Sequence, residues 1–180
     1  MNFRLRNLKA EDADGMLEWM HDPEINSVFG TTFESFDKEK VLCFIENAQD
    51  MSGESIHLAC VDEHDQYLGT VSLKNIDHVN SRAEYAISMR RRAHGTGASK
   101  YASEEILRIA FEELGLARVY LFLFALNERA DNFYNKFGFI YEGTFVKHIR
   151  LRGELCDVKW YRMLKEEWVE RKTIKDQVAF

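Results

Sequence analysis

The stretch Arg90-Arg91-Arg92-Ala93-His94-Gly95-Thr96-Gly97-Ala98-Ser99-Lys100 separates two segments of different periodicity. Residues 82–89 before it form a short run of β-type residues, and a helical pattern follows it to about residue 113. The sequence therefore predicts a strand, a basic glycine turn, and a helix that begins inside the turn. A helix N-terminus presents unpaired N–H groups and the positive end of the helix dipole, and glycines let the backbone approach a ligand closely. These features indicate an anion site for a phosphate or pyrophosphate, although an ordinary strand-to-helix turn explains the local pattern equally well.

The chain before this turn predicts one strand, two helices and three further strands. Pro23 separates the two helices, because proline cannot continue a helical hydrogen-bond ladder. The aromatic, hydroxyl-rich residues 26–36 lack a clear period and predict a loop that lines a pocket or covers the core. The expected strands are 3–7, 56–61, 67–76 and 82–89, and the expected helices are 8–20 and about 35–48.

The chain after the turn begins with a helix that Gly115 can end. Residues 119–125 are continuously apolar, which is typical of a strand covered on both faces, as in parallel pairing. A short helix over 127–137 ends at Gly138. Two more strands, 139–149 and 155–163, joined by a turn at 150–154, and a charged helical tail complete the chain.

Composition favours one packed globular domain over residues 1–180, with 167–180 as a charged tail. The chain is 46% hydrophobic and 13% aromatic, with a single proline and no linker-like stretch. It lacks both a membrane-length apolar run and a signal-peptide core. Cys43, Cys60 and Cys156 lack metal-ligand spacing, which predicts reduced thiols, a cytoplasmic location and no metal site. The net charge of −6 argues against nucleic acid as the main partner.

Two motifs occur in a fixed order and spacing. Arg92-x-x-Gly95-x-Gly97 lies at the strand-to-helix junction, and Asn127-x-x-Ala130-x-x-x-Tyr134-x-Lys136-x-Gly138-Phe139 follows the apolar strand. With these motifs the chain resembles the GNAT superfamily of acetyl-CoA-dependent N-acetyltransferases over about residues 3–168. Residues 82–85, 142–145 and 157–161 most resemble the branch of ribosomal-protein N-terminal, spermidine and nucleotide-amino-sugar acetyltransferases.

The resemblance implies an α/β (α+β) fold: a single GNAT domain with a mixed, mostly antiparallel seven-stranded sheet and flanking helices. Residues 119–125 would pair in parallel with 82–89, and the two strands would splay apart to admit acetyl-CoA. The backbone of the earlier strand would pair with the pantetheine arm of coenzyme A, and the glycine turn would hold its pyrophosphate. The coenzyme-binding residues that it implies are Ile87, Ser88, Met89, Arg92, His94, Gly95, Thr96, Gly97, Ala98, Ser99, Asn127 and Tyr134.

Direct acetyl transfer needs a proton donor for the thiolate and a proton acceptor for the amine. The resemblance identifies Tyr134 as the donor, because a phenol with a pKa of about 10 stays protonated at neutral pH. Glu84 is the candidate base, with His148 and Glu142 as alternatives. The competing structural interpretations are a core tyrosine for Tyr134, a solvent-facing strand residue for Glu84, and a helix N-cap for Asn127.

The acceptor is expected to be a primary amine of a small molecule, such as a nucleotide-linked amino sugar. Aromatic and basic side chains that would suit such a ligand are Trp19, Phe29, Phe33, Lys147, His148 and Arg150. A polyamine, which would need an acidic pocket from Glu24, Glu34 and Glu46, is an alternative, as is a protein N-terminus. A coenzyme A-binding module without catalysis is the alternative from another class. A homodimer through the C-terminal strands is also expected, and no membrane partner.

Overall fold

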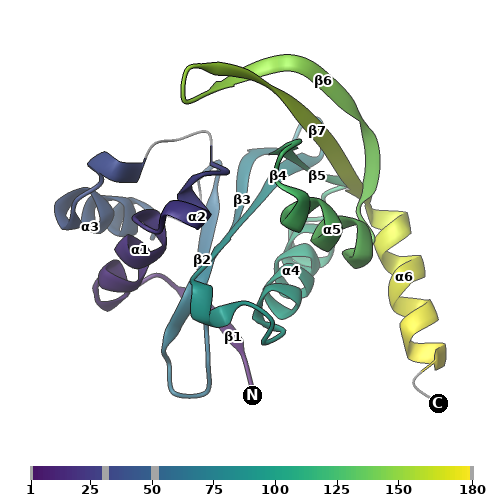
Figure 1. The fold of residues 1–180 in the computed structure, drawn as a ribbon. Helices are drawn as coiled ribbons and strands as arrows, with labels where there is room; N and C mark the ends of the chain where they lie inside the picture. The colour runs from purple at the N-terminus through teal and green to yellow at the C-terminus, as the bar shows by residue number, and fades with distance from the viewer. Residues whose placement is uncertain (1, 30–32, 50–52, 179–180) are drawn as a thin grey trace.

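The computed structural model describes residues 2–29, 33–49 and 53–178, and within them seven strands form one sheet (Figure 1). The order across the sheet is β1-β2-β3-β4-β5-β7-β6. The strands are β1 (Arg4–Asn7), β2 (Ile56–Val61), β3 (Tyr67–Asp77), β4 (Arg82–Met89), β5 (Arg118–Phe124), β6 (Ile140–Leu151) and β7 (Glu154–Leu164). The α-helices are α1 (Ala13–Met20), α2 (Pro23–Asn26), α3 (Lys38–Asn47), α4 (Ala98–Arg108), α5 (Glu128–Phe137) and α6 (Lys165–Val178).

Strands β4 and β5 form a parallel pair in an otherwise antiparallel sheet. Their register has three positions, from Arg82 opposite Arg118 to Glu84 opposite Tyr120. β4 then runs on to Met89 and β5 to Phe124 without pairing to each other. The two strands therefore separate after Tyr120, which confirms the predicted splay. The region between residues 85–89 and residues 121–124 is called the gap below.

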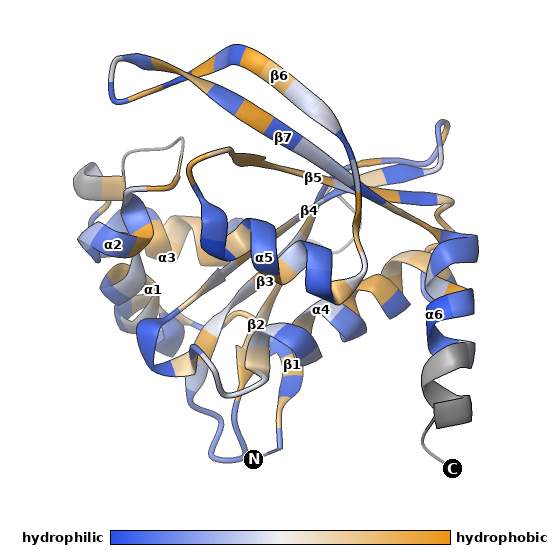
Figure 2. Ribbon diagram, turned by 45° about the vertical axis from the view of Figure 1, so that its right-hand side comes forward, coloured by the Kyte–Doolittle hydropathy of each residue, from blue (hydrophilic) through white to orange (hydrophobic). Residues whose placement is uncertain are grey.

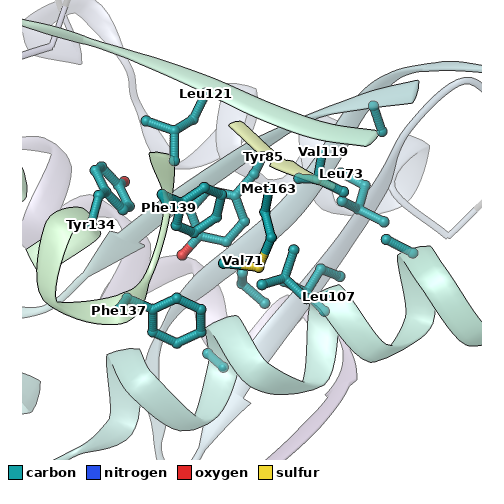
Figure 3. Packing of buried hydrophobic residues seen from close by; sticks show 14 of the residues in the cluster. Val71, Leu73, Tyr85, Leu107, Val119, Leu121, Tyr134, Phe137, Phe139 and Met163 are labelled. Carbon is teal, nitrogen blue, oxygen red and sulfur yellow. The ribbon is translucent and has the colours of Figure 1, made fainter. Parts of the chain in front are cut away.

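The sheet has two covered faces, because successive side chains of a strand point to opposite sides. One face packs on α4 and α5 and holds Leu73, Tyr85 and Leu121 in the main core (Figure 3). The other face carries a second cluster, in which Ala59 and Val61 pack with residues of α1 and α3. The β6–β7 hairpin arches away from the far side of the sheet (Figures 1 and 2). The gap thus opens between α4 and α5 on one face and the hairpin with the N-terminal helices on the other.

One predicted turn needs correction, and two local features were not predicted. Pro23 is the first residue of α2, where its missing N–H costs nothing, and Asp22 caps that helix by accepting from the Glu24 N–H at 3.0 Å. The 150–154 turn is shorter than predicted, because Arg152 and Gly153 both adopt positive φ, 51° and 91°, and form a two-residue hairpin turn. The helix after the glycine turn ends in a π-helical turn, Ile109–Glu113.

The remaining short segments follow the predicted order. The first expected helix is a 3₁₀ turn, Ala10–Asp12, followed by α1. The predicted 26–36 loop contains α2's end and a 3₁₀ turn, Phe33–Ser35, while residues 30–32 lie outside the described part. A third 3₁₀ turn, Arg91–Ala93, leads from β4 toward α4.

Candidate functional site

The glycine turn forms an open cradle at the start of α4. Gly95 and Gly97 adopt φ values of 78° and 93°, a conformation that favours glycine. A Cβ atom built at Gly95 would meet nothing within 4 Å, so the space beside it is open. Thr96 accepts a hydrogen bond from the Ala98 N–H at 3.3 Å, but within the described residues the N–H groups of Ser99 and Lys100 have no acceptor. This arrangement fits a phosphate or pyrophosphate group.

The basic residues of the turn divide into those that form ion pairs with acidic side chains of the protein and those that do not. Arg90 pairs with Glu18 of α1 and donates to the Tyr67 carbonyl at 3.0 Å. Arg91 pairs with Asp22 and with Glu24, at 2.7 and 2.9 Å.

Arg92 is exposed and donates from one guanidinium nitrogen to the Tyr67 carbonyl at 3.0 Å, which leaves its other N–H groups without a hydrogen-bond partner among the described residues. Arg92 and the exposed Lys100 are therefore the cations of this stretch that can reach a ligand's phosphates.

His94 and Asn127 tie the turn to α5. The His94 Nδ1 lies 2.7 Å from a guanidinium nitrogen of Arg129, in the first turn of α5. Partial burial and the Arg129 charge lower the pKa of His94, so the ring is neutral at pH 7. Asn127 is the N-cap of α5, since its Oδ1 accepts from the Ala130 N–H at 3.1 Å. Its side-chain NH₂ is left for another partner, so capping and ligand binding are compatible.

Tyr134 lies on α5 and faces the same side of the sheet as Tyr85 (Figure 3). Its ring makes an edge contact with Tyr85 at 5.9 Å between centroids, and another with Phe139 at 5.6 Å. Burial raises the pKa of Tyr134, and its hydroxyl has no hydrogen-bond partner among the described residues. By contrast, the buried hydroxyl of Tyr85 bonds Ser103 at 2.7 Å, and that of Tyr161 donates to Asp131. Tyr134 therefore carries a protonated donor that the fold itself does not use.

Glu84 lies on β4 at the last position paired with β5, where the gap begins. Its side chain is 11% exposed and points to the face opposite Tyr85. One carboxylate oxygen is 2.5 Å from the Lys74 Nζ, and the other accepts from the Asn75 side-chain amide at 2.9 Å. The structure thus places Tyr134 and Glu84 on opposite faces of the sheet, with both Glu84 oxygens engaged.

The alternative bases lie elsewhere. Glu142 pairs with Arg118 and with Arg162, at the closed end of the gap, and the Arg118 hydrogen bond lowers the pKa of this carboxyl. His148 is exposed on β6 and packs its ring against Phe145, with centroids 5.0 Å apart. The structure brings neither residue together with Tyr134.

The residues predicted for the acceptor do not form one pocket. Trp19 is buried in the second core and donates to the Tyr67 hydroxyl at 3.1 Å, with Phe29 and Phe33 packed on it. Lys147 and Arg150 lie exposed on β6. Glu24 is neutralised by Arg91, Glu46 is exposed on α3, and the Glu34 side chain lies outside the described residues. The acidic pocket predicted from Glu24, Glu34 and Glu46 is therefore not assembled by the described side chains of this set.

Two features of the gap could not be identified from the motifs. On the face opposite α4, Trp160 of β7 contacts Tyr120, Phe122 and Phe145, with centroid distances of 5.9, 5.2 and 5.4 Å. The alternation of aromatic residues in β5, at Tyr120 and Phe122, was the sequence signal that could have predicted this cluster. The contact of Arg129 with His94 was not predicted, although Arg129 is a charged residue inside the Asn127–Phe139 motif.

A cavity of about 400 Å³ lies away from the gap, between β1, α1 and the β2–β3 turn. Five acidic and three basic residues line it, and some of them form ion pairs, for example Arg6 with Asp12 at 2.7 Å. It is not the candidate site. Within the described residues, no helix is both long and apolar enough to cross a membrane, and no cluster of three or more His, Cys, Asp or Glu side chains could hold a metal ion.

A sheet whose parallel strands separate beside a glycine-rich helix start defines a class of acyl-group transferases. The family model of the Acetyltransferase (GNAT) domain matches residues 2–140. The chain is 28% identical to the spermidine N(1)-acetyltransferase of Escherichia coli K12 over 156 residues, 84% of this chain and 80% of the relative. It is 26% identical over 166 residues to an uncharacterized N-acetyltransferase, p20, of Bacillus licheniformis, covering 91% and 93% of the two chains.

The fold agrees with these relationships. The crystal structure of spermidine N-acetyltransferase from Vibrio cholerae in complex with CoA and spermine superposes with a TM-score of 0.81, at 23% identity, over 93% of this chain and 98% of that one. The chain therefore belongs to the GNAT acetyltransferase family and is an N-acetyltransferase.

Proposed function

We propose that residues 1–180 form one catalytic domain that transfers the acetyl group of acetyl-CoA to a primary amine of a small molecule by direct attack. The observation that carries the proposal is the gap between β4 and β5, with the glycine cradle at its mouth and the unused hydroxyl of Tyr134 on one side. A binding module without catalysis would not need an unpartnered tyrosine hydroxyl beside the gap.

The proposed coenzyme site runs from the cradle into the gap. The amides of residues 95–99 bind the pyrophosphate, with Arg92 and Lys100 beside it. The free edge of β4 over Ile87, Ser88 and Met89 pairs with the pantetheine arm as a further strand would. The side-chain amide of Asn127 contacts the same arm.

Tyr134 is the proposed proton donor. When the amine attacks the thioester, the carbon–sulfur bond breaks, and the Tyr134 hydroxyl protonates the departing thiolate. The raised pKa of Tyr134 keeps this proton in place at neutral pH.

Glu84 is the base predicted from the sequence, and its place at the start of the gap supports that role. However, Glu84 would have to exchange its contact with Lys74 for the amine before it could accept a proton.

Among acceptors, the relatives support a polyamine better than a nucleotide-linked amino sugar, because two of the similar proteins are spermidine acetyltransferases. One structural observation favours the nucleotide-linked amino sugar: the aromatic side chains around Trp160 offer a flat apolar surface beside the gap. A protein N-terminus remains the third acceptor. The cytoplasmic location and the homodimer stay predictions from the sequence.

An acceptor panel tests the proposal. Purified protein is mixed with acetyl-CoA and spermidine, spermine, monoamines, amino sugars free and nucleotide-linked, or short peptides, and thiol release is measured together with the mass of the product. We expect turnover with at least one small amine and a product heavier by one acetyl group. Coenzyme A binding without turnover of any amine would contradict the enzyme function and support the binding-module alternative.

A further inference from the structure

Two polar residues and one alanine form a row across the sheet, on the face opposite α4, that ends at the gap. His57 of β2 pairs in register with Ser72 of β3, and Ser72 pairs with Ala86 of β4. Paired residues share a face, and Ala86 lies two residues after Glu84, so this row is on the Glu84 side. β4 and β5 are last paired at Glu84, which makes Ala86 the first residue of this face that borders the gap.

Ala86 is half-buried and Ser72 is 6% exposed, so the row meets the gap at the small side chain of Ala86. Neighbouring strands lie about 4.8 Å apart, so a group bound over Ala86 is within reach of the Ser72 hydroxyl. Glu84 lies one row further toward the closed end, where it contacts Lys74. Ser72 shares this region of the face with the hydroxyls of Tyr120 and Ser88, and among the described residues it is the one of the three that contacts a histidine ring.

His57 and Ser72 form a hydrogen-bonded pair. The His57 Nδ1 is 2.8 Å from the Ser72 Oγ, and the ring packs edge-on against Phe44 of α3, with centroids 5.0 Å apart. Burial lowers the pKa of His57, and the charge of Lys74 on β3 adds to this effect. The Lys74 ammonium is itself held by Glu84 of β4, and Phe44 carries no charge, so no carboxylate contacts the imidazole within the described residues. A neutral imidazole next to a hydroxyl can accept a proton through it.

We propose that Ser72 and His57 form a proton relay that receives the proton of the attacking amine, a role that rests on the acetyl transfer proposed above. The amine nitrogen bonds to the thioester carbon, and the carbon–sulfur bond breaks. The thiolate takes the proton of Tyr134, and the nitrogen gives its extra proton to the Ser72 Oγ as Ser72 passes its own to the His57 Nδ1. Tyr134 and His57 then return to their neutral forms by proton exchange with solvent. Ser72 touches the substrate, while His57 acts through it.

The relay differs from the Glu84 route in what it requires. Proton uptake by Glu84 requires the 2.5 Å contact with Lys74 to be replaced, whereas His57 Nδ1 and Ser72 Oγ already lie at hydrogen-bond distance, and in the tautomer with the proton on Nε2 the Nδ1 accepts from the hydroxyl.

The test compares pH profiles of kcat at saturating amine, using the acceptor found in the panel, for the wild type, His57→Gln, Ser72→Ala, the double variant and Glu84→Gln. The matched control is His64→Gln, an exposed histidine in the turn of the same β2–β3 hairpin. Melting temperature and coenzyme A affinity are measured for each variant, because the relay lies away from the glycine cradle and should leave that affinity unchanged.

In the wild type, kcat should fall as the pH drops through the lowered pKa of His57, because only the neutral ring accepts a proton. His57→Gln should lose that acidic limb, and kcat at pH 7 should fall about 100-fold, the lower end for general-base catalysis. Ser72→Ala should give the same loss, and the double variant should be no slower than either single one, since the two residues act as a unit.

An acidic limb that persists in both His57→Gln and Ser72→Ala overturns the relay, as does its disappearance in Glu84→Gln alone. If His57→Gln fails to fold, Ser72→Ala decides the question by itself. A wild type that turns over no amine overturns the proposed function and the relay with it, whereas an active wild type with unchanged variants overturns the relay alone.

Discussion

At the scale of single residues, the hydrogen bonds of the core tyrosine hydroxyls distinguish structural tyrosines from a candidate catalytic one. The hydroxyl of Tyr85 hydrogen-bonds to Ser103, and the hydroxyl of Tyr161 donates to Asp131. Tyr134 is as buried as a core residue, with 8% of its surface exposed, but its hydroxyl bonds no described residue. The hydroxyl oxygen keeps contact with solvent, so a group bound at the gap can reach it.

We predict that Tyr134→Phe lowers kcat about 100-fold while the affinity for coenzyme A stays within a factor of about two, because only the proton donor is lost. Since burial raises the pKa of Tyr134, the wild type should keep this contribution up to at least pH 10, and the variant should lack it at every pH below that. Steady-state kinetics and calorimetric binding of coenzyme A measure the two quantities. Full activity in Tyr134→Phe would remove this residue from the mechanism.

At the scale of elements, the glycine turn connects four elements of the molecule. It ends β4, begins α4, and contacts both α1 through Arg90 and α5 through His94. The two glycines hold its backbone in a conformation that other residues adopt at a cost of about 1–2 kcal/mol. The turn therefore depends on glycine for its shape as well as for access to its amides.

Gly95→Ala and Gly153→Ala form a matched pair that separates these two roles. Both glycines have positive φ, 78° and 91°, and a Cβ atom at either would meet nothing within 4 Å. We predict a similar loss of stability, about 1–2 kcal/mol, for both variants in urea unfolding. Only Gly95→Ala should also weaken coenzyme A binding, by about 10-fold or more, because its methyl group enters the cradle. Equal affinities in the two variants would mean that the pyrophosphate does not lie at Gly95.

At the scale of the whole molecule, the sheet consists of two parts joined by a short seam. Strands β1 to β4 form one part and β5, β7 and β6 the other, and the parallel seam has three paired positions. The two core clusters on α4 and on α1–α3 support the first part from both faces. A ligand that fills the gap contacts both parts of the sheet and should stabilise their association.

We predict that coenzyme A at 100 times its Kd stabilises the fold by about 2.7 kcal/mol and raises the melting temperature by about 5–10 °C for a domain of this size. Differential scanning calorimetry measures the shift. Pantetheine, which lacks the pyrophosphate, is the control and should give a smaller shift at the same concentration. The absence of any shift with coenzyme A would contradict the proposed site.

Much of the fold followed from the sequence because its signals are local. The apolar run at 119–125 and the glycine turn predicted β5 and the start of α4, and the family resemblance that the two motifs carry implied the splayed parallel pair. The proximity of His57 and Ser72 to the gap depends instead on the register of three strands, which no local pattern encodes. The same holds for Lys74, whose contact with Glu84 requires a cross-strand pairing. The partners of the candidate base were thus unpredictable from the sequence, and the coenzyme-binding residues stay a prediction.

The short seam between β4 and β5 also bears on how the protein behaves in solution. Beyond Glu84 and Tyr120, each strand leaves one row of backbone N–H and C=O groups without a neighbouring strand, and the free part of β5 is strongly apolar. Unpaired apolar edges of this kind are templates for strand addition by other chains and so for aggregation. We expect the coenzyme A proposed for the gap to cover these edges as well, so the coenzyme-free protein should aggregate more readily than the coenzyme-bound one.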